Sequence, residues 1–112
     1  MRVTKDNINE FIEGTRINCP DMGITHIEYI PDGITGLNCW NNKLTELPKL
    51  PESLTDLYCD DNKLTELPKL PESLTNLYCR NNNLPYEITI DNYKEKHNKF
   101  IKRKLILSRI CG

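Results

Sequence analysis

The fourteen-residue sequence NKLTELPKLPESLT occurs twice in this chain, at Asn42–Thr55 and again at Asn62–Thr75. The two copies are offset by twenty residues, and the same offset separates four cysteines, Cys19, Cys39, Cys59 and Cys79. A fixed period of this length is typical of a solenoid, in which one unit cannot bury its apolar face alone and therefore stacks on its neighbours. The period thus predicts an architecture, and it directs the search for function to the positions where the copies differ.

Further apolar residues recur at the same period. The columns are Ile17, Leu37, Leu57 and Leu77; Ile24, Leu44, Leu64 and Leu84; Ile27, Leu47 and Leu67; Ile30, Leu50 and Leu70; and Ile34, Leu54 and Leu74. In Leu57-Tyr58-Cys59 the alternation directs leucine and cysteine inward and tyrosine outward, as in a half-buried strand. We therefore expect one short strand in each unit.

Two polar features complete the unit. Asparagine recurs at Asn42, Asn62 and Asn82, where its amide can bond to backbone groups of adjacent turns; the first unit is degenerate and has Met22 instead. Leu-Pro-Lys-Leu-Pro, at 47–51 and 67–71, disfavours helix because proline lacks an N–H and restricts the residue before it. We expect these segments to form an extended, polyproline-like outer face.

The unit reads Leu-x-x-Leu-x-Cys-x-x-Asn-x-Leu, most clearly at Leu54, Leu57, Cys59, Asn62 and Leu64. This pattern resembles the strand segment of the leucine-rich repeat. Its twenty-residue, proline-rich form is similar to the short repeats of bacterial effectors of the IpaH and SspH kind, and similar Leu-Pro-x-Ser-Leu-Thr units occur in predicted proteins of giant viruses. The resemblance implies an α/β leucine-rich-repeat solenoid with a short parallel β-sheet on its concave face and an extended convex face.

At 112 residues the chain has room for one domain, residues 1–112. We divide it into an N-terminal cap at 1–14, about four repeats at 15–88 and a basic C-terminal cap at 89–112. Caps are needed because a terminal repeat exposes both core and an open strand edge.

Both caps are predicted to be helical. Thr4 is a candidate N-cap for a helix over Lys5–Glu13, and Asp91 or Asn92 for a helix over about Tyr93–Ile110. Charge is distributed unevenly between these regions: residues 1–90 carry eight Lys and Arg against fourteen Asp and Glu, and residues 91–112 carry seven against two. The basic segment Lys94–Lys104 is expected to cap the acidic body, or alternatively to bind an anionic partner.

The sequence offers little support for catalysis or metal binding. The five cysteines include no Cys-x-x-Cys pair, and only His26 and His97 could complement them in a zinc site. Cys59-Asp60-Asp61 superficially resembles the Cys-x-Asp motif of the ubiquitin ligase domain that follows effector repeats of this type. An inward cysteine in apolar surroundings is a poor nucleophile, however. We predict buried reduced thiols, no catalytic residue, no metal and no cofactor.

The residues that point outward from the strands vary while the rest of the unit stays constant. The predicted partner-binding residues are Asn38, Trp40, Asp56, Tyr58, Asp60, Asn76, Tyr78 and Arg80. Exposed aromatic residues flanked by charges have the composition of an interaction hot spot. The alternative is that Tyr58 and Tyr78 stack on one another and only stabilise the sheet.

We therefore expect a monomeric, non-catalytic module that binds a protein partner through its concave sheet. The polar N-terminus lacks the apolar centre of a signal peptide, so we expect a cytoplasmic location, and the resemblance implies the cytoplasm and proteins of a host cell. Two alternatives stay open: a binder of nucleic acid or an anionic membrane surface through Lys94–Lys104, and a self-assembling structural protein.

Overall fold

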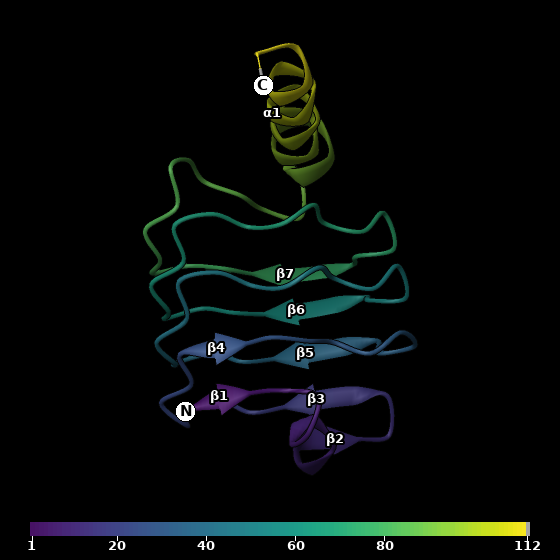
Figure 1. Cartoon of the computed structure of the whole chain (residues 1–112), viewed down its shortest axis with the longest axis vertical. Helices are drawn as coiled ribbons and strands as arrows, with labels where there is room; N and C mark the ends of the chain where they lie inside the picture. Colours follow the sequence, from purple (N-terminus) through teal and green to yellow (C-terminus); the bar gives the residue numbers. More distant parts are fainter. Residues whose placement is uncertain (112) are drawn as a thin grey trace.

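The structure, a computed structural model, describes residues 1–111, with side chains described through residue 108. It has mixed α/β character, with parallel strands and one C-terminal helix (Figure 1). The larger sheet has the order β2-β3-β5-β6-β7. Its strands are β2 (Ile12–Glu13), β3 (Arg16–Asn18), β5 (Gly36–Asn38), β6 (Asp56–Tyr58) and β7 (Asn76–Tyr78).

The register of this sheet reproduces the period of the sequence. Strands β3, β5, β6 and β7 are parallel, and Leu57 of β6 lies opposite Leu37 on one side and Leu77 on the other. Each of these partners is twenty residues away in the chain, so equivalent side chains lie side by side. A column read from the sequence is therefore a physical column in the sheet.

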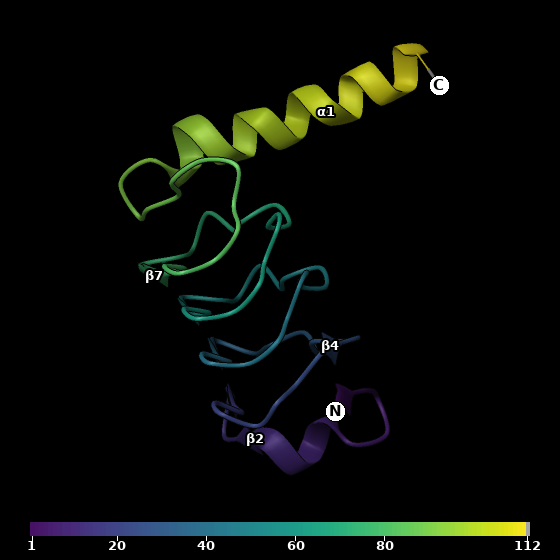
Figure 2. The ribbon, with the colours of Figure 1, turned by 90° about the vertical axis from the view of Figure 1, so that its left-hand side faces the viewer.

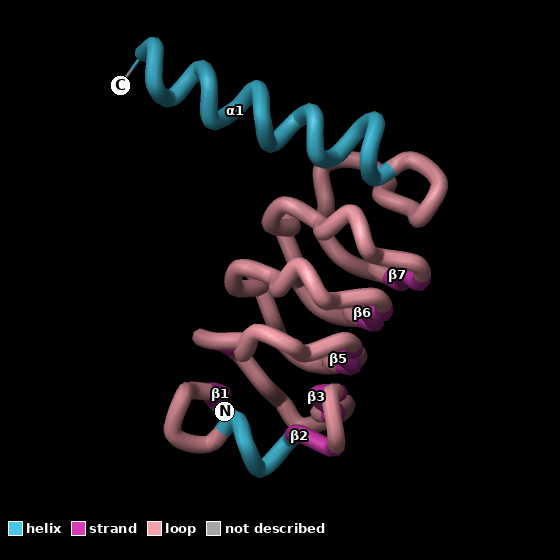
Figure 3. The backbone as a smooth tube through the Cα atoms, turned by 90° about the vertical axis from the view of Figure 1, so that its right-hand side faces the viewer, coloured by secondary structure: helices cyan, strands magenta, loops and turns pink. Residues whose placement is uncertain are grey.

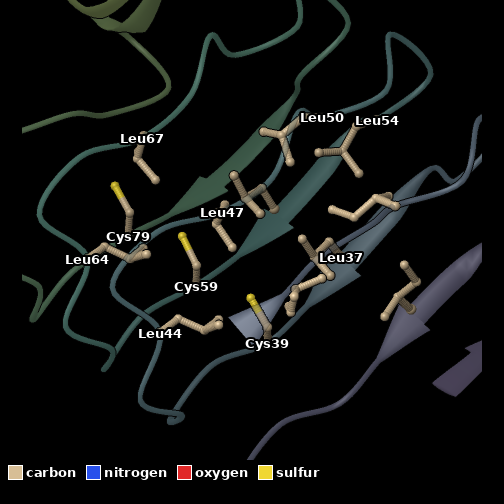
Figure 4. Packing of buried hydrophobic residues seen from close by; sticks show 14 of the residues in the cluster. Leu37, Cys39, Leu44, Leu47, Leu50, Leu54, Cys59, Leu64, Leu67 and Cys79 are labelled. Atoms are coloured by element: carbon tan, nitrogen blue, oxygen red, sulfur yellow. The ribbon is translucent and has the colours of Figure 1, made fainter. Parts of the chain in front are cut away.

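The core lies between the strands and the proline-rich segments, which contain no helix or strand at 43–53 or 63–73 (Figure 3). Leu37, Leu57, Cys39 and Cys59 point inward from the sheet and are fully buried. Leucines of the opposite segments, such as Leu47, Leu50 and Leu67, meet them (Figure 4). The inward position predicted for the cysteine column is confirmed.

The asparagine column bonds to the backbone as the sequence predicts. The Nδ2 of Asn62 donates to the carbonyls of Cys39, Cys59 and Asp60 at 3.0–3.2 Å, and its Oδ1 accepts from the Leu44 N–H at 3.1 Å. Asn42 and Asn82 make the equivalent bonds in their own units. One buried amide thus satisfies four backbone groups where the chain turns away from each strand.

A second polar column immediately before these asparagines was not predicted. Its members have a left-handed backbone with φ between 56° and 60°: Asp21, Asn41, Asp61 and Asn81. Asn and Asp tolerate this conformation better than other residues with a Cβ. The side chains also pair between units, since Asn81 Nδ2 donates to Asp61 Oδ1 at 2.8 Å and Asn41 donates to Asp21.

The prediction of an N-terminal capping helix over Lys5–Glu13 is wrong. Only Ile8–Phe11 (η1) is helical, as a single turn of 3-10 helix, and the next residues form β2, which pairs antiparallel with β3. Gly14, at φ 65°, allows the tight turn between these two strands. Ile12 and Glu13 therefore cover the first edge of the sheet with backbone hydrogen bonds, which a helix at the same position would not supply.

The first unit also contains a second, two-stranded sheet that the sequence pattern did not indicate. Strand β1 (Arg2–Val3) pairs in parallel with β4 (His26–Ile27). Val3 is fully buried in the core. The N-terminus is thus covered by strand pairing on both sides of the core.

The C-terminal cap is helical, as predicted. A turn of π-helix, η2 (Tyr93–His97), leads into α1 (Asn98–Cys111). The buried Tyr93 donates its hydroxyl to the Pro71 carbonyl at 3.0 Å, and Asn98 exchanges two hydrogen bonds with the backbone of Leu70. Polar side chains at the start of the helix therefore satisfy backbone groups of the last complete repeat.

His97 is the second buried anchor of this cap. Its Nε2 lies 2.8 Å from the Pro68 carbonyl, and its Nδ1 lies 3.0 Å from the Tyr86 hydroxyl. Because a carbonyl can only accept, Nε2 carries a proton, and in the neutral ring Nδ1 accepts from Tyr86.

Beyond this anchor the helix crosses the end of the stack and extends past it (Figure 2). Leu105, Ile106 and Leu107 are 45–59% exposed along this extension. None of the helices that the structure describes is long and apolar enough to cross a membrane.

Candidate functional site

The predicted binding residues lie on the outer surface of the strands or directly after them. In β6, Leu57 is fully buried between the half-buried Asp56 and Tyr58, and Asp60 follows the strand after the buried Cys59. The parallel register then aligns Asn38, Tyr58 and Tyr78 in one row. The alternation of short strands thus brings the predicted residues together on one face.

Aromatic side chains form the centre of this face. The rings of Tyr58 and Tyr78 stack with centroids 5.2 Å apart and planes within 9° of each other. Trp40 is 40% exposed and Tyr78 is 41% exposed. Together with Asp60 and Asp61, the three aromatic residues line a shallow, open hollow, which we call the aromatic hollow.

The predicted stacking of the two tyrosines is therefore confirmed, because their rings pack on one another. Stacking does not remove them from solvent, however. The ring of Tyr78 and the indole of the neighbouring Trp40 both keep a large exposed area.

Asp56 is the centre of a hydrogen-bonded network on the same face. Its carboxylate accepts from Arg16 Nη1 at 2.8 Å and from Asn76 Nδ2 at 2.5 Å. The Arg16 hydrogen bond, followed by that of Asn76, lowers the pKa of the Asp56 carboxyl below its ordinary value. The Asp56-to-Asn76 difference between the repeats therefore converts two repelling carboxylates into a donor and an acceptor.

Two further differences also act within the sheet. Asp60 Oδ1 accepts from the backbone N–H of Arg80 at 2.5 Å, and Asp61 pairs with Asn81 as described above. The residues that differ between the two repeats thus have a structural role that the sequence did not reveal. Among the described side chains, Arg80 forms no ion pair, so its guanidinium is available at the edge of the face.

Asn38 is the least accessible of the predicted residues. Its Nδ2 donates to Asn18 Oδ1 at 3.1 Å in the neighbouring strand. Its Oδ1 is enclosed and has no hydrogen-bond partner among the described residues. Asn38 therefore ties its strand to the neighbouring one, beside Tyr58, more than it contributes exposed surface.

The cysteine column is closed to chemistry in the folded state. Cys59 is fully buried, and burial raises the pKa of its thiol well above the ordinary value of 9.0. Burial also raises the pKa of Cys19 and of Cys79 to about 11. A thiol that stays protonated is a weak nucleophile. His26 is exposed on β4, and no group of potential metal ligands occurs among the described residues.

The basic segment Lys94–Lys104 makes several contacts with the acidic body. Lys94 pairs with Glu72 and Lys104 with Glu66, each at 3.3 Å, and Lys99 pairs with Glu95 of its own segment at 3.2 Å. All of these side chains are more than half exposed, so each pair contributes little to stability. Their geometry nevertheless fits a cap that attracts the repeats beneath it.

Comparison of the chain with known protein families, with curated proteins and with solved structures found no match in any of the three.

Proposed function

We propose that this chain is a leucine-rich-repeat solenoid that binds a protein partner through the outer face of its larger sheet and carries out no catalysis. The single observation that supports this function best is the aromatic hollow, in which exposed Trp40 and Tyr78 flank Tyr58 on a sheet held by continuous backbone pairing. Partly exposed aromatic residues at the centre of a polar rim are the usual composition of a binding hot spot.

Rigidity is the second support for this proposal. The side chains on the face are fixed by their neighbours, as in the Tyr58–Tyr78 stack and the Arg16–Asp56–Asn76 network. A surface that is ordered before binding loses little conformational entropy when a partner arrives. A short stack of repeats suits recognition for this reason.

The rim of the hollow favours a partner with basic side chains next to apolar ones. Asp60 and Asp61 border the aromatic rings. A cationic side chain placed over Trp40 would gain both cation–π attraction and a carboxylate neighbour. A partner carrying an acidic side chain at that point would be repelled.

The test is affinity capture from a lysate with the immobilised chain and with the double variant Trp40→Ala/Tyr58→Ala. The matched control is Tyr29→Ala, which removes a 37% exposed tyrosine outside the sheet face. We expect the double variant to lose the partners that both the parent chain and the Tyr29 variant retain. Equal capture by all three would rule out the face as the binding surface.

A second candidate function rests on α1. Leu105, Ile106 and Leu107 are exposed on a helix rich in lysine, a composition that also fits binding to anionic membrane surfaces. Sedimentation with vesicles that contain anionic lipid, at low and high salt, tests this candidate. Salt-sensitive binding would favour it, and absence of binding at low salt would eliminate it.

A further inference from the structure

Besides the ladder between the strands themselves, each unit of the parallel sheet pairs with the following one through the same three flanking backbone groups. The N–H of the cysteine donates to a carbonyl of the following unit, as from Cys59 to the Tyr78 carbonyl at 2.8 Å. The left-handed residue does the same, as in Asp61 N–H to the Arg80 carbonyl at 2.9 Å. The threonine carbonyl accepts, as in Thr55 from the Thr75 N–H at 2.8 Å.

The last unit, at β7, has the same three backbone groups, but no following strand offers them hydrogen-bond partners. Within the part of the chain that the structure describes, the N–H of Cys79, the N–H of Asn81 and the carbonyl of Thr75 have no hydrogen-bond partner. The opposite edge of the sheet differs, because β2 covers it by antiparallel pairing. Twenty residues after β7 the chain is already helical, at the end of η2 and the start of α1, so no further strand continues the ladder.

The side chains at this edge are also less completely covered. Leu77 and Cys79 are each 8% exposed, whereas Leu57 and Cys59 in the preceding unit are fully buried. The leucine and cysteine columns therefore end at a partly solvent-exposed edge. One more apolar layer would complete their burial.

A slot lies along this edge. It has a volume of about 510 Å³, and Thr75–Asn82 form one wall. Leu84 and residues 86–90 form the other wall, and the Cys79 thiol donates to the Ile88 carbonyl at 3.1 Å where the walls meet. The chain that leads from β7 to α1 thus passes over the edge without pairing with it (Figure 2).

We propose that this slot binds an extended peptide segment of another protein, which adds to β7 as the next parallel strand. Its carbonyls accept from the N–H groups of Cys79 and Asn81, and its N–H donates to Thr75. Addition of a strand to an open edge is a known mode of peptide recognition, in which backbone pairing gives affinity and alternate side chains give specificity. Apolar side chains at positions i and i+2 of the peptide pack on Leu77 and Cys79, continuing the leucine and cysteine columns.

The slot accepts a single strand and not a second copy of the folded chain. Its second wall, formed by Leu84 and residues 86–90, belongs to the same molecule and lies across the opening from β7. The β7 edge of another copy would bring its own sheet and its own covering segment into the same space. A peptide segment free of such neighbours has no such obstacle.

The repeat itself supplies the probe. A synthetic peptide with the sequence of residues 52–62, with Cys59→Ala to prevent disulfide formation, has the side-chain pattern of a strand in this sheet. We expect it to bind the full chain and to slow amide hydrogen exchange at Cys79 and Asn81 by at least about tenfold. Before peptide is added, the Cys79 amide should exchange much faster than the Cys59 amide.

Two N-methylated peptides test the orientation. In the sheet the Thr55 N–H points to the preceding strand and the Cys59 N–H to the following one. A methyl group on the peptide nitrogen at the Thr55 position should therefore weaken binding about tenfold, because it removes one hydrogen bond and obstructs the pairing. The methyl group at the Cys59 position points away from β7 and should leave binding unchanged.

Three results would overturn the proposal. One is a Cys79 amide that is as protected as that of Cys59 in the free monomer. Another is a peptide result that excludes pairing, either no effect of the parent peptide at millimolar concentration or equal loss with both methylated peptides. The third is self-association by light scattering accompanied by protection of the Cys79 amide without peptide, which would assign the edge to a second copy.

Discussion

Arg16 and Asp56 form an ion pair with Nη1 2.8 Å from the carboxylate oxygen, although forty residues separate them in the chain. They belong to β3 and β6, and β5 lies between these strands. The residue opposite both is Gly36, and the Arg16 guanidinium occupies the space that a Cβ at this position would need. A missing side chain in the middle strand thus lets two charged residues meet across it.

This ion pair predicts a pH-dependent stability. Its hydrogen bonds lower the pKa of Asp56 from the ordinary value of 3.8, so the stabilisation is complete above that value and is lost as pH falls through the folded-state pKa. At neutral pH we expect Asp56→Asn to lower the free energy of unfolding by about 1 kcal/mol, because Arg16 is nearly half exposed and the pair is partly screened.

Urea denaturation over a range of pH measures this effect. The difference between the parent chain and Asp56→Asn should shrink as pH falls below 3.8 and should vanish below the lowered folded-state pKa of Asp56, where both side chains are uncharged. Asp32→Asn, at an exposed position, is the matched control and should have little effect at any pH. A stability difference between the two chains that persists undiminished in acid would refute a charge-based origin of the stabilisation.

Gly36→Ala provides an independent prediction. The new methyl group meets only the flexible end of Arg16, so the arginine should move away at little cost to the fold. Alanine also removes backbone freedom from the unfolded chain, which offsets part of the lost ion pair. We therefore expect a change in stability within about 1 kcal/mol, together with a rise of the Asp56 pKa towards its ordinary value. NMR titration of the Asp56 carboxyl group measures that rise, and an unchanged pKa would show that Arg16 does not depend on the glycine.

The asparagine column predicts a much larger effect. Asn62→Ala leaves the buried Leu44 N–H without a partner and removes one of the two donors to each of three carbonyls, those of Cys39, Cys59 and Asp60. We expect a loss of about 2–3 kcal/mol in the free energy of unfolding, since the unsatisfied N–H carries a desolvation cost and three further hydrogen bonds are lost. Asn83→Ala removes an exposed asparagine in the next unit and should cost less than about 0.5 kcal/mol. Similar losses for the two variants would contradict the role given to the column.

The cysteines predict slow chemical modification. Burial keeps Cys39 and Cys59 protonated and closed to solvent, and it raises the pKa of Cys19 and Cys79 to about 11. In a Cys111→Ser chain at about pH 8, iodoacetamide should therefore alkylate none of the four quickly, but all of them after unfolding in urea. Mass spectrometry reads the sites. Cys79, next to the open edge of β7, should be the first to react in the native state, and rapid labelling of Cys59 would be inconsistent with the packed column.

The repeating interior of this chain could be read from its sequence. The columns of leucine and cysteine, the asparagine amides and the outward position of Tyr58 all follow from a twenty-residue period combined with the alternation of a strand. These features are local and repeat unchanged, so one unit predicts the next. The outward position of the candidate binding residues was predictable to the same extent, because register converts a sequence column into neighbours in space.

The features that sequence reasoning missed depend on contacts between distant residues or on the ends of the stack. The Arg16–Asp56 pair needs the register of three strands at once. At the N-terminus, helical spacing of Ile8, Phe11 and Ile12 competed with the open edge of β3, and pairing to that edge prevailed. The recurrence of Asn or Asp at Asp61 and its equivalents was a visible signal of left-handed backbone, but no prediction was drawn from it.

The central claim is that partners bind over the aromatic hollow, and Trp40 provides a direct measurement because it is the only tryptophan in the chain. Its indole is 40% exposed, so coverage by a partner should transfer it to less polar surroundings. Selectively excited Trp40 emission should therefore shift to shorter wavelength when a partner captured by the parent chain, in a form without tryptophan, is added. It should also become less accessible to iodide quenching. Saturating partner that leaves both the emission and the quenching of Trp40 unchanged would contradict binding at this face.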